Sequence, residues 1–305
     1  MNFFQFLEKF PTEKACINHF IEIRYKGDHY CHHCASTKVY HLHTEPKLFR
    51  CGDCDNSFSI FKNTIFENSS TDLRKWMYAI HLFINGKKGI SALQLQREIG
   101  VTYKTAWRIL TLIRIAMGNG GEFSKFEGTV EMDETYIGGK PRKRNKGNKD
   151  SDREVPNKRG RGSKNIPVIG LVNRETKQVY AKVTFPDENG KQVTKRQIFD
   201  ILLDATKRNT TVMTDFLPAY TLLKTTSYKH FRVDHKQMFA EGNVHTNHIE
   251  SFWSTLKRGI YGIYHQISPQ HMQKYVDEFC FRHNNRENGN VFDLVLFQGI
   301  RINSR

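Results

Sequence analysis

The sequence lacks any apolar run long enough to cross a membrane. A spanning helix needs roughly 18 to 20 predominantly apolar residues, and no stretch of the 305 residues approaches that length. The first residues, M-N-F-F-Q-F-L-E-K-F-P, also lack the basic start and apolar core of a secretory signal. Both absences argue against a membrane protein and predict a bacterial, cytoplasmic one.

Acidic residues are scarce relative to basic ones. The chain has 31 Asp and Glu against 47 Lys and Arg, a formal net charge of +16 with a pI near 9.6. A charge of this sign and size favours a polyanionic partner. Because the membrane alternative is weak, we expect the partner to be nucleic acid, and the protein to associate with the nucleoid. The length allows two or three domains.

Cysteine is also scarce, but four of the six cysteines form two pairs. Cys31 and Cys34 make one C-x-x-C pair, and Cys51 and Cys54 make another after sixteen residues. In a reducing compartment this spacing indicates a metal site rather than disulfides. Short β-like runs span 39–43, 48–50 and 58–61. The segment is typical of a zinc ribbon with four structural thiolate ligands, and contact between the ribbon and DNA stays open as a second role.

Helical periodicity between Thr71 and Met117 predicts a helix-turn-helix. One amphipathic helix ends at Asn85-Gly86, a short helix starts at Ser91, and a third starts at Tyr103 after a turn. Thr102 would cap the third helix, which would enter the major groove of DNA. The DNA contacts expected near its N-terminus are Tyr103, Lys104 and Arg108. The alternative is an ordinary three-helix bundle with solvated charges.

Three acids lie in a strand-like run from Thr129 to Ile137. Alternation places Glu131 and Asp133 on one face and apolar side chains on the other. Close carboxylates repel one another unless a cation lies between them. We therefore interpret Asp133 as a metal ligand. Glu131 and Glu134 are predicted to be surface or hairpin residues, with support of the ligands as the alternative.

A strongly basic segment follows this strand directly. Residues 140–164 contain eleven Lys or Arg against three acids, a net charge of +8. Its only apolar residues are Val155 and two prolines, which cannot form a hydrophobic core. This composition predicts a mobile loop over 140–165. Its place beside the acidic strand favours a DNA-clamping arm over a merely solvated insertion. The residues expected to contact DNA are Lys140, Arg142, Lys143 and Arg144.

The order of the remaining elements predicts an RNase H-like fold. Strands are expected over 165–173, 179–185 and 211–216, with helices over 192–208 and from Pro218. The resulting order, β-β-β-α-β-α, is the order of the RNase H-like fold, a mixed sheet flanked by helices. In that fold the first and fourth strands are neighbours. Asp133 would then lie beside Asp215, at the end of the fourth strand.

A third carboxylate lies in a predicted helix over 247–259. Its apolar stripe consists of Ile249, Phe252, Trp253 and Leu256. Glu250 and Lys257 share a flank of that stripe, so Glu250 could reach a metal while Lys257 reaches phosphate. The spacing Asn247-x-x-Glu250 also fits a capping box, in which Glu250 would only bond back to the backbone. Both interpretations remain open on this helix alone.

Taken in order, the motifs resemble the DDE transposases of bacterial insertion sequences that carry an N-terminal zinc ribbon. Besides the cysteine pairs they are T-I-F-E from Thr64, G-I-S-A-L-Q-L from Gly89, K-T-A-W-R from Lys104, E-M-D-E-T-Y-I-G-G-K from Glu131, T-D-F from Thr214, H-T-N-H-I-E-S-F-W-S-x-L-K-R-G from His245 and Y-V-D-E-F-x-F-R from Tyr275. The resemblance implies a catalytic trio of Asp133, Asp215 and Glu250 that binds Mg²⁺ or Mn²⁺, and zinc on Cys31, Cys34, Cys51 and Cys54.

The same resemblance implies the reaction and the partners. Such an enzyme binds the terminal inverted repeats, cuts them and joins the 3′-hydroxyl ends to target DNA, with Asp133 on both metal ions and the other two carboxylates on one each. Lys257 and Arg258 are further DNA contacts that we expect. At least a homodimer is expected, because two ends must be cut. A regulator without catalysis and an RNase H-like nuclease without strand transfer are the alternatives.

The domain division predicted from these motifs has three parts. A helix and the zinc ribbon occupy residues 1–66, and the helix-turn-helix occupies 67–122. The RNase H-like catalytic domain occupies 123–305 and contains the basic loop. The whole is a multidomain protein of the α+β or α/β class.

Overall fold

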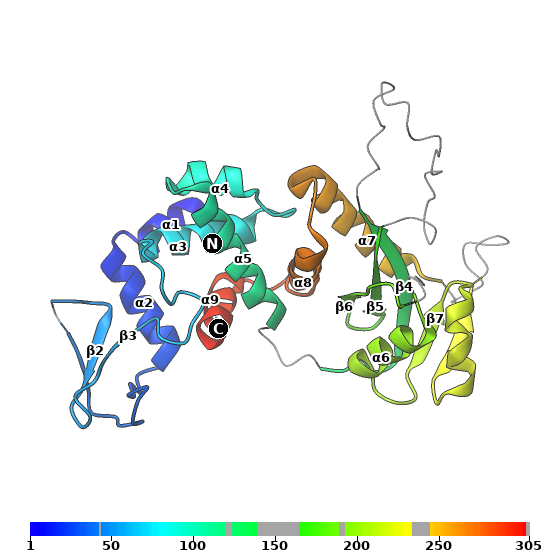
Figure 1. Cartoon of the computed structure of the whole chain (residues 1–305), viewed down its shortest axis with the longest axis horizontal. Coiled ribbons are helices and arrows are strands. Elements are labelled where there is room, and N and C mark those ends of the chain that lie inside the picture. Colours follow the sequence, from blue (N-terminus) through cyan, green and yellow to red (C-terminus); the bar gives the residue numbers. More distant parts are fainter. Residues whose placement is uncertain (43, 120–123, 139–164, 189–192, 234–244, 303–305) are drawn as a thin grey trace, which may run out of the picture. The chain divides into compact units, whose positions relative to one another are not determined.

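The computed structural model describes residues 1–42, 44–119, 124–138, 165–188, 193–233 and 245–302. The chain divides into two compact units (Figure 1). Unit 1 consists of Met1–Glu122 and Asn285–Arg305, and unit 2 is Phe123–Asn284. The expected DNA contacts Lys140, Arg142, Lys143 and Arg144 lie outside the described residues. Within the described ranges, no helix is both long and apolar enough to span a membrane.

Unit 1 begins with two helices and a small antiparallel sheet. Helix α1 is Phe3–Lys9, and α2 is Glu13–Tyr25 with Thr12 as its N-cap. The three strands, in spatial order, are β1 (Val39–His41), β2 (Leu48–Cys51) and β3 (Ser57–Ser59). Phe49 and Phe58 lie opposite one another in this sheet and are both buried. The predicted β-like runs are therefore strands, although the last one begins and ends earlier than expected.

The helix-turn-helix pattern forms three helices in unit 1. They are α3 (Leu73–Asn85), α4 (Ala92–Ile99) and α5 (Tyr103–Asn119). The hydroxyl of Ser91 accepts from the Gln94 N–H at 3.1 Å, and the hydroxyl of Thr102 accepts from the Thr105 N–H at 3.2 Å. Both are N-cap hydrogen bonds, which satisfy donors that the first turn of a helix leaves unpaired. The predicted starts of the second and third helices are confirmed. They could be predicted because local capping residues determine where a helix begins.

The last helix of the chain belongs to unit 1. Helix α9 (Val291–Arg301) contacts α2, α3 and α5, and the Ile65 N–H donates to the Gly299 carbonyl at 3.0 Å. Its buried side chains Phe292, Val295, Leu296 and Ile300 follow helical spacing. The predicted domain 123–305 placed this helix with the catalytic sheet. The helix packs instead on the helices of unit 1, which bury its apolar stripe.

Unit 2 is built on one mixed sheet of five strands. In spatial order they are β6 (Val179–Val183), β5 (Ile166–Asn173), β4 (Thr129–Ile137), β7 (Thr211–Thr214) and β8 (Lys229–Arg232). β4 pairs antiparallel with β5 and parallel with β7. β6 continues antiparallel to β5, and β8 is parallel to β7. This is the predicted RNase H-like mixed sheet; only β8 was absent from the prediction.

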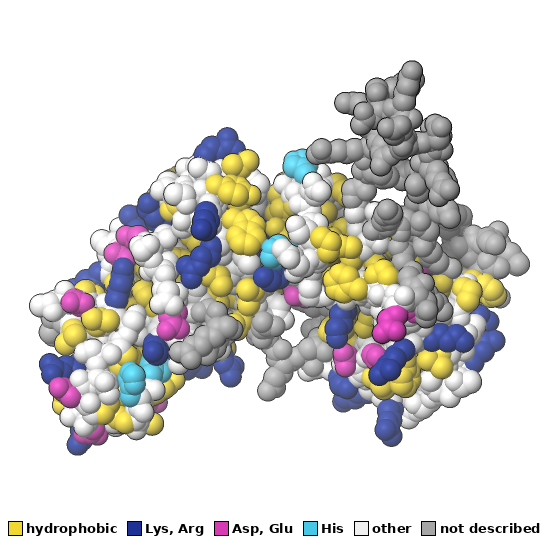
Figure 2. Space-filling view, viewed as in Figure 1, with side chains coloured by type: hydrophobic (Ala, Val, Ile, Leu, Met, Phe, Trp, Pro, Cys, Tyr) yellow, Lys and Arg dark blue, Asp and Glu magenta, His cyan; other side chains and the backbone are white. Residues whose placement is uncertain are grey.

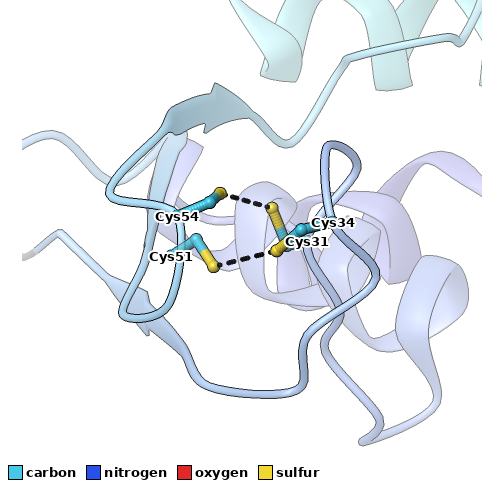
Figure 3. Close-up of side chains that lie close together, drawn as sticks. All are labelled: Cys31, Cys34, Cys51 and Cys54. Carbon is cyan, nitrogen blue, oxygen red and sulfur yellow. Dashed lines mark hydrogen bonds between the residues drawn. The ribbon is translucent and has the colours of Figure 1, made fainter.

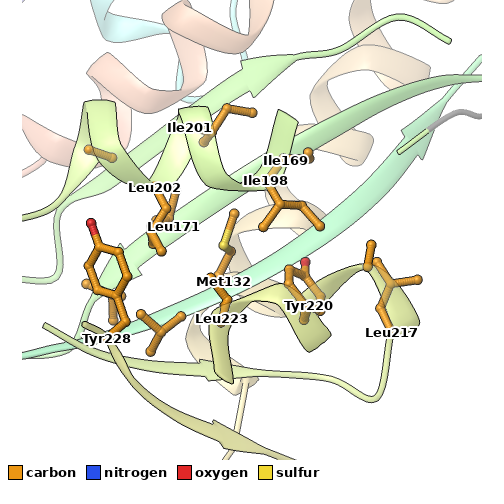
Figure 4. Close-up of a cluster of buried hydrophobic side chains, with 14 of the residues drawn as sticks. Met132, Ile169, Leu171, Ile198, Ile201, Leu202, Leu217, Tyr220, Leu223 and Tyr228 are labelled. Atoms are coloured by element: carbon orange, nitrogen blue, oxygen red, sulfur yellow. The ribbon is translucent and has the colours of Figure 1, made fainter. Parts of the chain in front are cut away.

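Helices cover both faces of the sheet. Helix α6 (Lys195–Ala205) and the 3₁₀ helix η2 (Pro218–Thr225) cover one face, where Met132 and Leu171 meet Leu202 and Tyr220 (Figure 4). The other face is covered by α7 (Asn247–Gly259) and α8 (Met272–Asn284). A π-helical turn, η3 (Ile260–Tyr264), and a 3₁₀ turn, η4 (Pro269–His271), connect α7 and α8. Alternation along β4 therefore sends Met132 to one layer and Asp133 to the other.

Candidate active site and zinc centre

The four paired cysteines converge at one point of unit 1. The Sγ atoms of Cys31 and Cys54 lie 3.6 Å apart, as do those of Cys34 and Cys51 (Figure 3). Four thiolates about 2.3 Å from zinc in a tetrahedron have edges of about 3.8 Å, so the observed spacing fits zinc. The backbone N–H and the side-chain amide of Asn56 lower the pKa of the Cys54 thiol to about 6, which favours the thiolate that zinc requires.

Asp133 and Asp215 lie side by side, as predicted from the strand order. β4 and β7 are parallel and Met132 is level with Thr214, so the next residue of each chain segment reaches the same position. One carboxylate oxygen from each of Asp133, Glu134 and Asp215 lies within 4.8 Å of the other two. The Asp215 carboxylate also accepts from the Leu217 N–H at 3.1 Å.

Electrostatic repulsion is concentrated on Asp133. Burial raises its pKa well above the ordinary value, and the charges of Glu134, Asp215 and Glu250 raise it further. A divalent cation would reverse this effect, because it offsets the repulsion and replaces the lost solvation. Hard carboxylate oxygens are the ligands that Mg²⁺ and Mn²⁺ prefer. The donor set therefore fits such an ion.

Glu134 belongs to this carboxylate group and is half-buried, which favours the alternative prediction, support of the ligands, over a surface position. Its side chain lies on the face covered by η2, where the buried Tyr220 hydroxyl donates to Glu134 Oε2 at 3.1 Å. Tyr220 and Asp133 are distant in the sequence, and only the packing of η2 on the sheet brings the tyrosine to the site.

Glu250 lies in the first turn of α7. The helix begins at Asn247 with Thr246 as N-cap, so Asn247 is not the cap and the capping-box interpretation is wrong. The Glu250 carboxylate accepts from the Thr246 hydroxyl at 3.0 Å and is exposed. It acts on the pKa of Asp133, yet among the described residues the compact group of acids contains Glu134 rather than Glu250.

Glu131 is fully buried, so its prediction as a surface residue is wrong. Its carboxylate accepts from Arg174 Nε at 2.8 Å, from His248 Nδ1 at 2.8 Å, and from the N–H groups of His248 and Ile249 at 2.8 and 3.2 Å. Burial alone would raise its pKa, but the hydrogen bonds from His248 and Arg174 hold the pKa below the ordinary value. The carboxylate thus does for α7 what an N-cap side chain does, from a neighbouring strand.

His245 also lies close to this carboxylate, with Nδ1 3.1 Å from Glu131 Oε1. Glu131, His245 and His248 form a group with metal-ligand spacing. The Glu131 oxygens are already occupied by a guanidinium and two backbone N–H groups, which makes this network structural. A sequence signal for it existed: alternation places Glu131 on the same sheet face as Asp133, and a helix covers that face.

The expected DNA contacts in the described part of the chain lie at the surface of their helices. On α5, Tyr103 is 51% exposed, and Lys104 and Arg108 are exposed as well. On α7, Lys257 is half-buried and Arg258 is exposed. Figure 2 shows further Lys and Arg side chains across the visible face of both units.

Three comparisons relate the chain to known proteins. Among solved structures, it resembles the Mos1 strand transfer complex with a TM-score of 0.30 and 13% identity, over 73% of this chain and 78% of that chain. The intasome of simian T-cell lymphotropic virus in complex with PP2A regulatory subunit B56 gamma gives a TM-score of 0.29 and 12% identity, over 65% and 66% of the two chains.

Two sequence relatives cover different shares of the chain. An "Uncharacterized protein in transposable element ISH50" of Halobacterium salinarum is 28% identical over 90% of this chain and 92% of its own length. An "Uncharacterized transposase-like protein" of Haemophilus influenzae is 31% identical over 30% of this chain and 72% of its own. The family model of the ISXO2-like transposase domain matches residues 125–284, and that of the transposase zinc-ribbon domain matches residues 11–57.

Proposed function

The chain belongs to the ISXO2-like transposase family, and from this premise we propose that it cuts the ends of an insertion sequence and joins their 3′-hydroxyls to target DNA. The same active site would serve both steps. In the first step water attacks the phosphorus at the transposon end, and in the second the freed 3′-hydroxyl attacks target DNA. An in-line displacement at phosphorus is the same chemistry for either attacking oxygen.

One arrangement supports this proposal above all. Asp133 and Asp215 lie together where β4 and β7 run parallel, and Glu250 acts on Asp133 from the first turn of α7. These are the three residues that the resemblance to DDE transposases implies as catalytic. They come from three separate elements, so the fold rather than the sequence spacing assembles them.

The carboxylates would hold the catalytic cations. Mg²⁺ or Mn²⁺, when bound, would supply Lewis-acid stabilisation of the attacking and leaving oxygens. By the family pattern, Asp133 would hold both ions, and Asp215 and Glu250 would hold one each. Glu134 lies within reach of the same position. Glu131 keeps the first turn of α7 against β4, and thereby keeps Glu250 near Asp133.

DNA would be bound by several basic elements. We assign recognition of the terminal repeats to α5, through Tyr103, Lys104 and Arg108 near its N-terminus. Lys257 and Arg258 on α7 would contact phosphate near the carboxylates, and the basic segment 140–164 would add charge. Since two ends must be cut, we expect at least two copies of the chain in the active complex.

The test is an assay on the full zinc-loaded chain. Purified protein is incubated with Mg²⁺, a labelled transposon-end duplex and a target plasmid. We expect joined product from the unmodified protein and only background from Asp133→Asn. Asp200→Asn is the matched control, because Asp200 is a solvent-exposed acid on α6 that pairs with Arg196 one turn earlier on the same helix.

Other outcomes would support a different function. Nicked duplex without joining would indicate an RNase H-like nuclease. Retention of the duplex without cleavage would indicate a DNA-binding regulator. Joining that survives Asp133→Asn would overturn the catalytic assignment.

A further inference from the structure

Trp253 is a buried residue of α7 whose ring nitrogen needs an acceptor. Its side chain is 4% exposed and belongs to the apolar cluster between α7 and the sheet. An indole N–H can only donate, and buried donors are almost always hydrogen-bonded. The acceptor is Oδ2 of Asp133, at 3.1 Å from Nε1. A residue of the apolar stripe therefore bonds directly to the acid at the centre of the carboxylate group.

Gly170 provides the space for this contact. It lies in β5 directly opposite Asp133 in the antiparallel register. A Cβ atom at Gly170 would lie 2.5 Å from Cη2 and 2.8 Å from Cζ2 of Trp253, closer than such atoms approach one another. The indole can lie against the sheet beside Asp133 only because this position has no side chain.

We propose that Trp253 is a positioning residue for metal binding, which sets the orientation of the Asp133 carboxylate by donating its indole N–H to Oδ2. The inference rests on the proposed function, in which Asp133 is the ligand shared by both cations. The hydrogen bond from the indole restricts rotation of the Asp133 carboxylate. The direction in which Oδ1 points is restricted with it. Hydrogen bonds of this kind to metal ligands typically contribute 10- to 100-fold in metal affinity.

The bond also ties two metal ligands together. Glu250 lies three residues before Trp253 on α7, so one helix carries both a carboxylate and the donor to Asp133. Glu131, two residues before Asp133 on β4, holds the start of the same helix. Two contacts from one strand to one helix thus determine the register of β4 against α7, and with it the separation of Asp133 and Glu250.

The test measures Mn²⁺ affinity without DNA and without turnover. Free Mn²⁺ is followed by electron paramagnetic resonance in the zinc-loaded full chain. Trp253→Phe keeps the ring in the core and removes only the N–H, and we expect it to weaken Mn²⁺ binding about tenfold. Trp76→Phe is the matched control. It removes another buried indole hydrogen bond, from Trp76 Nε1 to Ser69 Oγ at 2.8 Å in unit 1, and should leave the affinity unchanged.

A second variant approaches the same bond from the other side. Gly170→Ala leaves every donor and acceptor in place but displaces the ring, so it should weaken Mn²⁺ binding, as Trp253→Phe does.

A third measurement needs no substitution at the site. The indole ¹⁵N–¹H resonance of Trp253, identified by elimination with Trp76→Phe and Trp107→Phe, should shift when Ca²⁺ is added to the metal-free carboxylates.

The outcomes separate this inference from the proposed function. Mn²⁺ binding that Asp133→Asn abolishes but Trp253→Phe leaves within twofold overturns the positioning role and leaves the function intact. An indole resonance that does not shift with Ca²⁺ would likewise overturn the positioning role and leave the proposed function intact. Absence of any Asp133-dependent Mn²⁺ binding in the unmodified protein overturns both.

Discussion

At the scale of single residues, Glu131 shows how a buried charge is made compatible with a protein core. An isolated buried carboxylate is costly, and here the cost is offset by a guanidinium, a histidine and two helix N–H groups. Each of these bonds is charge-assisted and therefore stronger than a bond between neutral groups. Together they join β4, the turn after β5 and the start of α7 at one point.

Removing the charge of Glu131 should destabilise unit 2. Glu131→Gln keeps the shape but removes the charge that pairs with Arg174, so we expect the free energy of unfolding to fall by about 3 kcal/mol, as for a broken buried ion pair. Urea unfolding measures it. Glu127→Gln is the control, because Glu127 pairs with Lys207 at the surface, where such pairs contribute about 0 to 1 kcal/mol. Equal losses in the two variants would contradict the role assigned to Glu131.

His230 should make stability depend on pH. Burial lowers its pKa from 6.5 to about 4, and the charges of Arg232 and Lys224 act in the same direction. Between these two values the unfolded chain binds a proton that the folded chain does not, so stability falls as pH decreases from about 6.5 to 4. We expect His230→Gln to reduce that slope in thermal unfolding measured across this range. An unchanged slope would show that His230 carries no part of the dependence.

At the scale of elements, helix α8 covers the edge strand of the sheet and also packs against α7. The side chains of Gln273 and Asn284 pair with the free backbone groups of the edge strand β6, including bonds of 2.7 Å to the N–H groups of Val183 and Val179. An edge strand covered in this way cannot pair with another chain. α7 and α8 touch at Gly259, which has no side chain to keep them apart.

A side chain at Gly259 should separate the two helices. A Cβ atom there would lie 2.0 Å from Cζ of Phe279, whose ring is buried. We expect Gly259→Ala to lower the free energy of unfolding by about 1 to 3 kcal/mol, the usual cost of overpacking a core. Gly262→Ala is the matched control three residues later, where nothing lies within 4 Å of the added atom. A similar loss in both variants would exclude the steric explanation.

At the scale of the whole molecule, the excess positive charge is the feature that the proposed function uses most directly. The net charge of +16 is distributed over both units and the basic segment 140–164. Counterion release makes the affinity for duplex DNA fall steeply with salt, with a slope in log–log form of about −0.9 per neutralised phosphate. Charge therefore supplies affinity, whereas α5 would supply choice of sequence.

The salt dependence can be assigned to residues. We expect Lys104→Ala and Arg108→Ala each to reduce the slope of log affinity against log salt by about 1, measured by fluorescence anisotropy with a transposon-end duplex. Lys195→Ala is the control, because Lys195 is exposed in the first turn of α6, on the sheet face opposite α7. A slope that changes equally in all three variants would mean that α5 has no special role in binding.

The sequence by itself determined whatever depends on neighbours in the chain. The cysteine pairs predict the zinc ligands, because each pair needs only a tight turn. The caps Ser91 and Thr102 predict helix starts, because an N-cap bonds to an N–H within three residues. Alternation and element order predict the RNase H-like sheet and the proximity of Asp133 to Asp215. Two of the proposed metal ligands could be predicted for the same reason, since Asp215 directly follows β7 and Glu250 lies in the first turn of α7.

Only the tertiary structure decided which buried groups meet across the fold. Glu131 and His248 are 117 residues apart in the chain, and Asp133 and Trp253 are 120 apart. Helix α9 packs on the first helices of the chain rather than on the sheet that precedes it. A hydrogen bond or an apolar contact over such a separation depends on packing in three dimensions. For that reason Asp215 and Glu250 could be found from the sequence, but the place of Glu134 beside Asp133 and the partners of these acids on α7 and η2 could not.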